Sequence, residues 1–291
     1  MEELFKARHF SDYVDQMLGF LASHGKNLDP GDRGAKLYFL GIAAFACHDY
    51  QSATCFFDAA ASEDFKVPNS ESQPAHLFMC LDAANPNQAG LEIVRKIVQK
   101  LEQAIGNYKE RPDAVAISDR MVRESFLRPQ MRQRQKHRRT LITTFISFLA
   151  EWDFRAQMIE LKTDGSKEPF FTHLFRGCLL FESLLKNSKE PPPQKNRPTL
   201  GDFLKAPNFK KRLGIETIVT SCDDFGALVR SLRRQDRSLQ AAIQCTAQVR
   251  NTLGHNLVWA SQRLNRKNYD LLANNIAASC LHAIATLYAR P

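Results

Sequence analysis

The sequence predicts an all-α protein. Apolar residues recur at the 3.6-residue period of a helix, most regularly over the segment 168–186. The stripe in that segment consists of Phe171, Leu174, Phe175, Cys178, Phe181 and Leu185. No stretch shows the apolar–polar alternation that marks a half-buried strand. Turns rich in proline, glycine and aspartate separate the helical stretches, as at residues 28–32.

The composition points to a globular chain with acidic partners. The 291 residues carry a net charge of +9, and nucleic acid is the commonest partner of such basic chains. The seven cysteines are dispersed and show no metal-ligand spacing, so we expect buried, reduced thiols, a cytoplasmic location, and neither metal nor cofactor. The N-terminus lacks a signal-peptide layout, and we expect no membrane-spanning segment.

The N-terminal half is predicted to hold a helix pair around residues 37–60. Leu40-Gly41, Tyr50, Ala53, Phe57 and Ala60 resemble the packing positions of a tetratricopeptide repeat, although an ordinary αα-hairpin explains them as well. Helices are also expected at residues 1–25, 75–84, 90–105, 114–126 and 141–161. If the resemblance holds, these N-terminal helices would bind a partner protein or a small ligand.

A strongly basic stretch runs from residue 123 to residue 139. A run of this kind either tracks a phosphate backbone or forms a solvated helix face or linker. A second basic run lies at residues 230–237. We take as candidate RNA-binding residues Arg132, Arg134, Lys136, Arg138, Arg139, Arg233, Arg234 and Arg237.

The predicted domain boundary follows the helix that ends near Leu161. It divides the chain into a helical domain, residues 1–165, and a helical bundle, residues 166–291. The bundle is expected to contain helices at residues 168–186, 200–213, 223–234, 239–249 and 268–289.

The candidate site lies between the last two of these helices. Arg250 is followed by Asn251 and, after four intervening residues, by His255. Together with its helical apolar flanks, this pattern resembles the catalytic motif of HEPN-domain ribonucleases. A second Arg-to-His match, from Arg132 to His137, lacks both the asparagine and the apolar frame, so we reject it.

The resemblance implies metal-independent cleavage of single-stranded RNA. The 2′-hydroxyl would attack the adjacent phosphorus and leave a 2′,3′-cyclic phosphate and a 5′-hydroxyl. Imidazole suits proton transfer near neutral pH, and guanidinium suits the phosphate because it stays charged and donates parallel hydrogen bonds. The expected catalytic residues are therefore Arg250, Asn251 and His255. The family also implies a defence or toxin-type response, including antiviral defence.

Helical geometry adds a constraint on the site. Residues five apart on an unbroken helix point about 140° from each other, so Arg250 and His255 would not face one phosphate. Either the helix distorts near Gly254 or a second chain completes the site. The resemblance favours a homodimer with a composite cleft.

One further residue is predicted to support the site. Arg250 falls on the apolar stripe of its own helix, where a guanidinium requires a carboxylate partner. Glu182 falls on the stripe of the helix over residues 168–186. We therefore predict a Glu182–Arg250 hydrogen bond that orients the arginine.

Two other functions fit the same residues. A non-catalytic helical adaptor would dimerise through the HEPN-like bundle without cutting RNA. An RNA-binding protein would act through the basic stretch alone.

Overall fold

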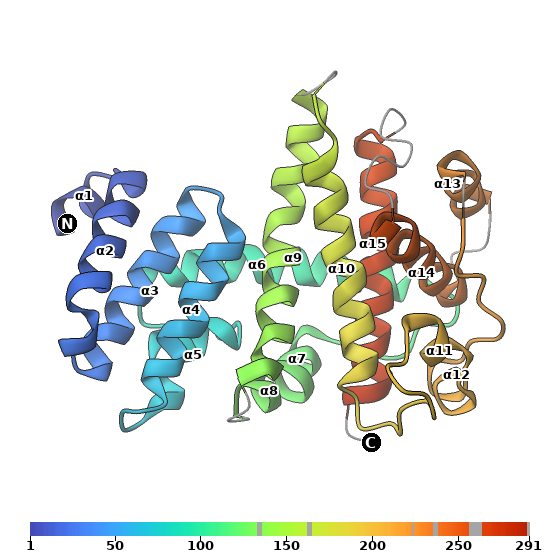
Figure 1. Cartoon of the computed structure of the whole chain (residues 1–291), viewed down its shortest axis with the longest axis horizontal. Helices are drawn as coiled ribbons and strands as arrows, with labels where there is room; N and C mark the ends of the chain where they lie inside the picture. Colours follow the sequence, from blue (N-terminus) through green and yellow to red (C-terminus); the bar gives the residue numbers. More distant parts are fainter. Residues whose placement is uncertain (133–135, 162–164, 223, 235–237, 256–263, 290–291) are drawn as a thin grey trace. The chain divides into compact units, whose positions relative to one another are not determined.

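The computed structural model describes residues 1–132, 136–161, 165–222, 224–234, 238–255 and 264–289. Helices joined by turns and loops make up this part of the chain, and it contains no strand (Figure 1). The all-α prediction is confirmed. The chain forms two compact units, the first from residues 1–99 and 127–151, the second from residues 100–126 and 152–291.

The units do not follow the predicted division at residues 165/166. Helices α6 (Gln88–Lys109) and α9 (Lys136–Leu161) each contribute residues to both units. The later part of α6 belongs to the second unit because its apolar residues are buried there. Within that unit, the Tyr108 hydroxyl lies 3.0 Å from Nδ1 of His282, and both side chains are buried.

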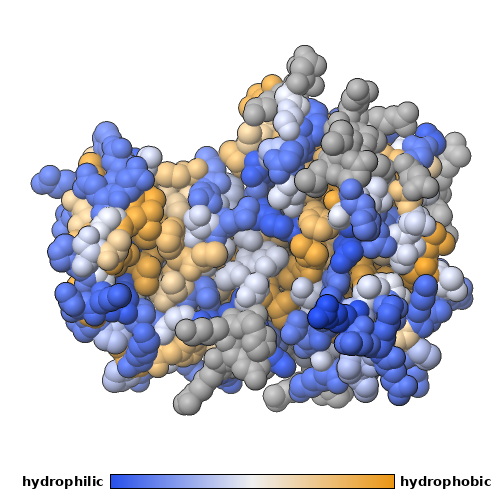
Figure 2. Space-filling model, viewed as in Figure 1, coloured by the Kyte–Doolittle hydropathy of each residue, from blue (hydrophilic) through white to orange (hydrophobic). Residues whose placement is uncertain are grey.

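The first unit contains the predicted helix pair. Its helices are α1 (Glu2–Lys6), α2 (Phe10–His24), α3 (Pro30–Ala46), α4 (Tyr50–Asp64), α5 (Pro74–Met79), α8 (Arg128–Arg132) and the first parts of α6 and α9, with short 3-10 turns at Gly25–Asn27 and Ser70–Ser72. On the face drawn in Figure 2, hydrophobic residues reach the surface over α2 to α4.

Close packing joins α3 to α4. Asp29 and Asp49 cap the two helices by accepting backbone N–H bonds from Asp32 and Ser52, at 3.0 and 3.1 Å. A Cβ at Gly41 would lie 2.8 Å from the Phe57 ring, so only glycine permits this approach. The hairpin is therefore fixed by a small residue at the position that the sequence singled out.

The second unit is built around three long helices. These are α10 (Glu168–Lys186), α14 (Leu239–His255) and α15 (Arg266–Ala283), which pack against one another. Around them lie α11 (Leu200–Lys205), α12 (Pro207–Leu213), α13 (Phe225–Arg234), α7 (Asp119–Val122), and the π-helices η3 (Arg123–Leu127) and η5 (Ile284–Tyr288).

Several predicted boundaries are wrong. The helix expected at residues 114–126 begins only at Asp119, because Ser118 caps it by accepting a bond from the backbone N–H of Met121 at 3.1 Å. The helix expected at residues 200–213 is two helices, with Pro207 beginning the second. Four cysteines are buried as expected, whereas Cys47 and Cys55 are exposed.

The C-terminal segment also differs from expectation. Among the described residues, Arg266–Tyr288 is long and apolar enough to cross a membrane by length and composition, with a mean hydropathy of 1.3. Of this window, 78% is buried inside the structure. A core helix passes the same test, and α15 packs against both α10 and α14.

Candidate functional site

The motif lies at the C-terminal end of α14. The sequence predicted a helix ending at Val249, but the helix continues unbroken through Gly254 to His255. At its other end, both carboxylate oxygens of Asp113 accept from the backbone N–H of Leu239 at 2.9 Å. Arg250, Asn251 and His255 are therefore carried by one anchored helix.

Arg250 and Glu182 form the predicted contact. The Nε of Arg250 donates to Oε2 of Glu182 at 2.7 Å, joining α14 to α10. The Glu182 side chain is 5% exposed and that of Arg250 is 27% exposed. Lys186, one turn further along α10, donates to the other oxygen of Glu182 at 2.5 Å. The buried carboxylate thus has two cationic partners.

The rest of the Arg250 guanidinium lies beside Gly254. A Cβ at Gly254 would lie 3.9 Å from Nη1 of Arg250 and 3.6 Å from the Phe175 ring, both ordinary van der Waals distances. Nη1 lies 3.4 Å from Oδ1 of Asn251, and Nη2 has no hydrogen-bond partner in the part of the chain described. The Nε of the guanidinium is therefore held by Glu182, whereas Nη2 is without a hydrogen-bond partner among the described residues.

His255 is the last residue of α14 and is exposed. Because the helix does not break at Gly254, the angular offset of about 140° from Arg250 remains. A local distortion, the first way of bringing the two side chains together, is absent. A single chain does not direct Arg250 and His255 at one phosphate.

The side chain of Asn251 is hydrogen-bonded to the neighbouring segment that precedes α13. Its Nδ2 donates to the carbonyl of Thr220 at 2.9 Å, and Thr252 donates to the carbonyl of Cys222 at 3.0 Å. This leaves only the Oδ1 of Asn251 facing Arg250. The side chain positions the arginine and the segment rather than standing free.

Sequence reasoning missed the polar stripe that anchors this segment. Gln240 and Gln244 accept hydrogen bonds from the backbone N–H groups of Glu216 and Val219, at 3.0 and 3.3 Å. Gln248 donates to the carbonyl of Ser221 at 3.4 Å. Glutamines at four-residue intervals on a predicted helix are the signal that would have revealed this stripe.

The basic residues before and at the start of α9 have different environments. Arg139 is only 3% exposed, and its guanidinium donates to Asp58 at 2.6 Å and to the Ser62 hydroxyl. Its assignment to RNA binding is therefore corrected, because a buried and paired guanidinium is not presented to a phosphate. Arg132 is exposed and lies 3.4 Å from Glu71, while Arg138 is half-buried.

The second basic run is described in part. Arg233 is exposed, and its Nη2 donates to Oδ1 of Asn268 at 2.7 Å. Arg134 and Arg237 lie outside the described residues, as do the side chains of Lys136 and Arg234. Arg132 and Arg233 are therefore the candidate RNA-binding residues that the structure places at the surface.

Two histidines elsewhere in the second unit serve the core. Nδ1 of His173 lies 2.7 Å from the Tyr269 hydroxyl, and Nε2 of His282 lies 2.9 Å from the carbonyl of Leu213. Burial lowers the pKa of His282. Both imidazoles are buried hydrogen-bonding groups of the core.

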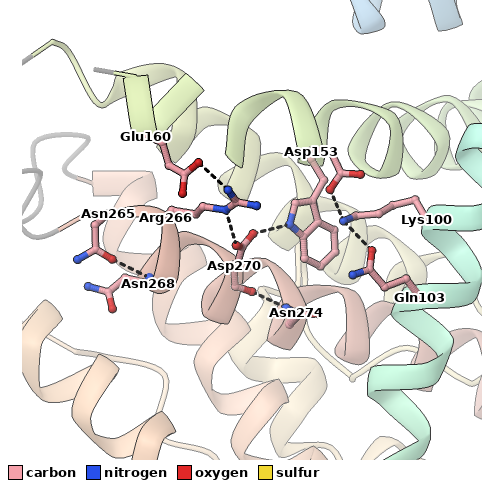
Figure 3. A network of polar contacts seen from close by, with 10 residues as sticks. Lys100, Gln103, Asp153, Glu160, Asn265, Arg266, Asn268, Asp270 and Asn274 are labelled. Carbon is pink, nitrogen blue, oxygen red and sulfur yellow. Dashed lines mark hydrogen bonds and ion pairs between the residues drawn. The ribbon is translucent and has the colours of Figure 1, made fainter. Parts of the chain in front are cut away.

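The second unit also contains a polar pocket, which is an alternative candidate site. Figure 3 shows its charged groups paired within the pocket wall between α6, α9 and α15. Lys100 contacts Asp153 and lies 4.5 Å from the Trp152 ring centroid. Arg266 lies 2.6 Å from Glu160. Because each of these charges has a partner, the network is a structural joint between the three helices.

Among the described residues, no group of three or more His, Cys, Asp or Glu side chains is arranged to hold a metal ion. No protein-family model matches the chain, and no curated protein or solved structure matches it either. The candidate site therefore rests on its own geometry and chemistry.

Proposed function

We propose that this protein is a metal-independent endoribonuclease that cleaves single-stranded RNA at a composite site of two chains. The observation that carries the proposal is the Glu182–Arg250 ion pair. The buried carboxylate holds Nε, and Nη2 of the same guanidinium, which has no hydrogen-bond partner among the described residues, is left to bind a phosphate.

A second chain would supply the histidine that a single chain does not direct at the phosphate bound by Arg250. In a two-fold dimer, Arg250 of one chain would meet His255 of its partner, which removes the angular conflict on a single helix. The imidazole would accept the proton of the 2′-hydroxyl as that oxygen attacks phosphorus. Arg250 would hold the negative phosphoryl oxygens, and the 5′-oxygen would leave with the proton that the same imidazole took from the 2′-hydroxyl.

The charge of the chain supports a polyanionic substrate. Its net charge is +9, and Arg233 on α13 is exposed on the element that precedes α14. We include a defence or toxin-type role, cytoplasmic location and homodimerisation in the proposal on the strength of the motif's resemblance alone.

The test is cleavage of a fluorescently labelled single-stranded RNA in excess EDTA. We expect the wild-type chain to cleave it, and Arg250→Ala and His255→Ala each to lose at least about 100-fold in rate, since each removes one catalytic interaction. Arg95→Ala and His24→Ala provide matched controls, because both residues are exposed on helices of the first unit.

Mixing the two inactive variants tests the composite site. Random pairing makes half of the dimers mixed, and each mixed dimer has one complete site, so activity should return to about a quarter of the wild-type value. No recovery on mixing would reject the composite arrangement. RNA binding without cleavage would instead indicate an RNA-binding protein, and neither activity would indicate an adaptor.

A further inference from the structure

A pocket in the first unit contains a buried carboxylate that has no ion-pair partner among the described residues. The pocket has a volume of about 430 Å³ and lies between the start of α3, the end of α4 and the segment leading into α5. Its walls are mostly apolar and include Phe39, Val67 and Pro74. The volume is within the range of small-molecule sites, roughly 300–1,000 Å³.

Asp64, the last residue of α4, provides the charge in this pocket. The residue is 6% exposed, and its Oδ2 is buried without a hydrogen-bond partner in the described part of the chain. A Cβ at Gly34 would lie 3.0 Å from Oδ1 of Asp64. The close approach of α3 to this carboxylate therefore depends on a glycine at that position. Burial raises the pKa of Asp64 to about 6, so the group is ionised at neutral pH and above.

The neighbouring cations do not compensate Asp64. Glu63, on the same helix, accepts from Lys66 at 2.7 Å and lies 3.5 Å from Arg33 of α3. His76 of α5 contributes a backbone hydrogen bond to Asp64, and burial lowers the pKa of its imidazole, which is therefore neutral. A buried carboxylate without a counter-charge is costly and is a strong acceptor for a cation.

We propose that this pocket binds a small organic cation, with an ammonium or guanidinium head on Asp64. The apolar body of the ligand would lie against Phe39, Val67 and Pro74, and Tyr38 and Asn87 line the same space. A metal ion fits less well, because Ca²⁺ and Mg²⁺ require several oxygen ligands and the pocket offers one carboxylate. Water would supply hydrogen bonds but no compensating charge.

This site is independent of RNA cleavage. All its residues lie between Gly31 and Asn87, in the first unit, whereas Arg250 and His255 belong to the second. The N-terminal helices would therefore bind an organic cation with an apolar body. Composition and periodicity did not indicate this class of ligand.

Isothermal titration with phenethylamine and with agmatine tests the site directly. We expect at least one of these cations to bind the full-length chain at pH 8, with dissociation constants below about 1 mM, and the neutral analogue 2-phenylethanol to bind at least about tenfold more weakly. Affinity should fall below pH 6, where Asp64 gains a proton.

Two variants make the test specific. Asp64→Asn keeps the side-chain shape and removes the charge, so affinity should fall at least about tenfold; Asp15→Asn, exposed on α2, should change nothing. Ala35→Trp fills the pocket from an exposed position of α3 and should abolish binding with the fold intact. Equal binding by Asp64→Asn, equal binding of the neutral analogue, or no binding of either cation at about 10 mM would overturn the proposal.

Discussion

The pair of Glu182 and Arg250 allows a quantitative test of the candidate site. Removing either partner breaks the 2.7 Å bond between α10 and α14. A net hydrogen bond to a charged group is worth about 1.5–3 kcal/mol, and breaking a fully buried ion pair costs about 3–5 kcal/mol. Because Arg250 is 27% exposed and Glu182 keeps Lys186, water and the lysine offset part of that loss. We therefore expect each alanine variant to lower the free energy of unfolding by about 1.5–3 kcal/mol.

A double-mutant cycle isolates the interaction between the two side chains. Glu182→Ala, Arg250→Ala and the double variant should give a coupling free energy of about 1–2 kcal/mol. Urea unfolding followed by tryptophan fluorescence measures it. In a Trp259→Phe background the buried Trp152 is the remaining tryptophan, and it belongs to the same unit as the pair.

Glu182 is also expected to position the guanidinium of Arg250 for catalysis. If it orients Arg250, Glu182→Gln should lower the turnover number more than it raises the Michaelis constant, since the guanidinium remains present but less fixed. A coupling free energy below about 0.3 kcal/mol, or equal unfolding curves for Glu182→Ala and wild type, would refute this reasoning.

Three further predictions concern stability. Gly41→Ala should cost about 1–3 kcal/mol by urea unfolding, because the new Cβ meets the Phe57 ring at 2.8 Å, and unchanged stability would contradict the packing described. The pKa of Asp64 rises on folding from 3.8 to about 6, so the contribution of this group to wild-type stability should fall by about 2.4 kcal/mol as pH rises from 4 to 7. Asp64→Asn should remove that fall, and the same pH profile in the variant would exclude the assignment. Thr246→Val should cost about 1–2 kcal/mol in thermal unfolding, since it leaves the buried hydroxyl of Ser279 without its 2.9 Å contact, while a neutral effect would contradict that role.

Helical periodicity predicted the fold class and one long helix to the residue. The segment 168–186 has the bounds of α10, because an uninterrupted apolar stripe ends there in asparagine and serine. Periodicity did not predict the helix ends correctly where the residues on both sides of the observed end are compatible with a helix. Thus α14 continues six residues past Val249, and α9 begins within the basic run at Lys136.

The Glu182–Arg250 contact was predictable because two charged residues occupied apolar stripes on separate helices. Each would be costly if buried alone, so they were expected to pair, and they do. The burial of Arg139 and its pairing with Asp58 were not predictable in the same way. Its sequence neighbours are basic and polar, and only the fold brings Asp58 of α4 to it.

The sequence by itself determined that the chain is helical and that Glu182 and Arg250 are partners, since both follow from the spacing of apolar and charged residues along single helices. Only the tertiary structure decided which charges are compensated. Arg139 is buried against Asp58, whereas Asp64 is buried with no cation beside it among the described residues, although both look like ordinary charged helix residues in sequence. Charge compensation depends on contacts between distant segments, and such contacts exist only after the helices have packed.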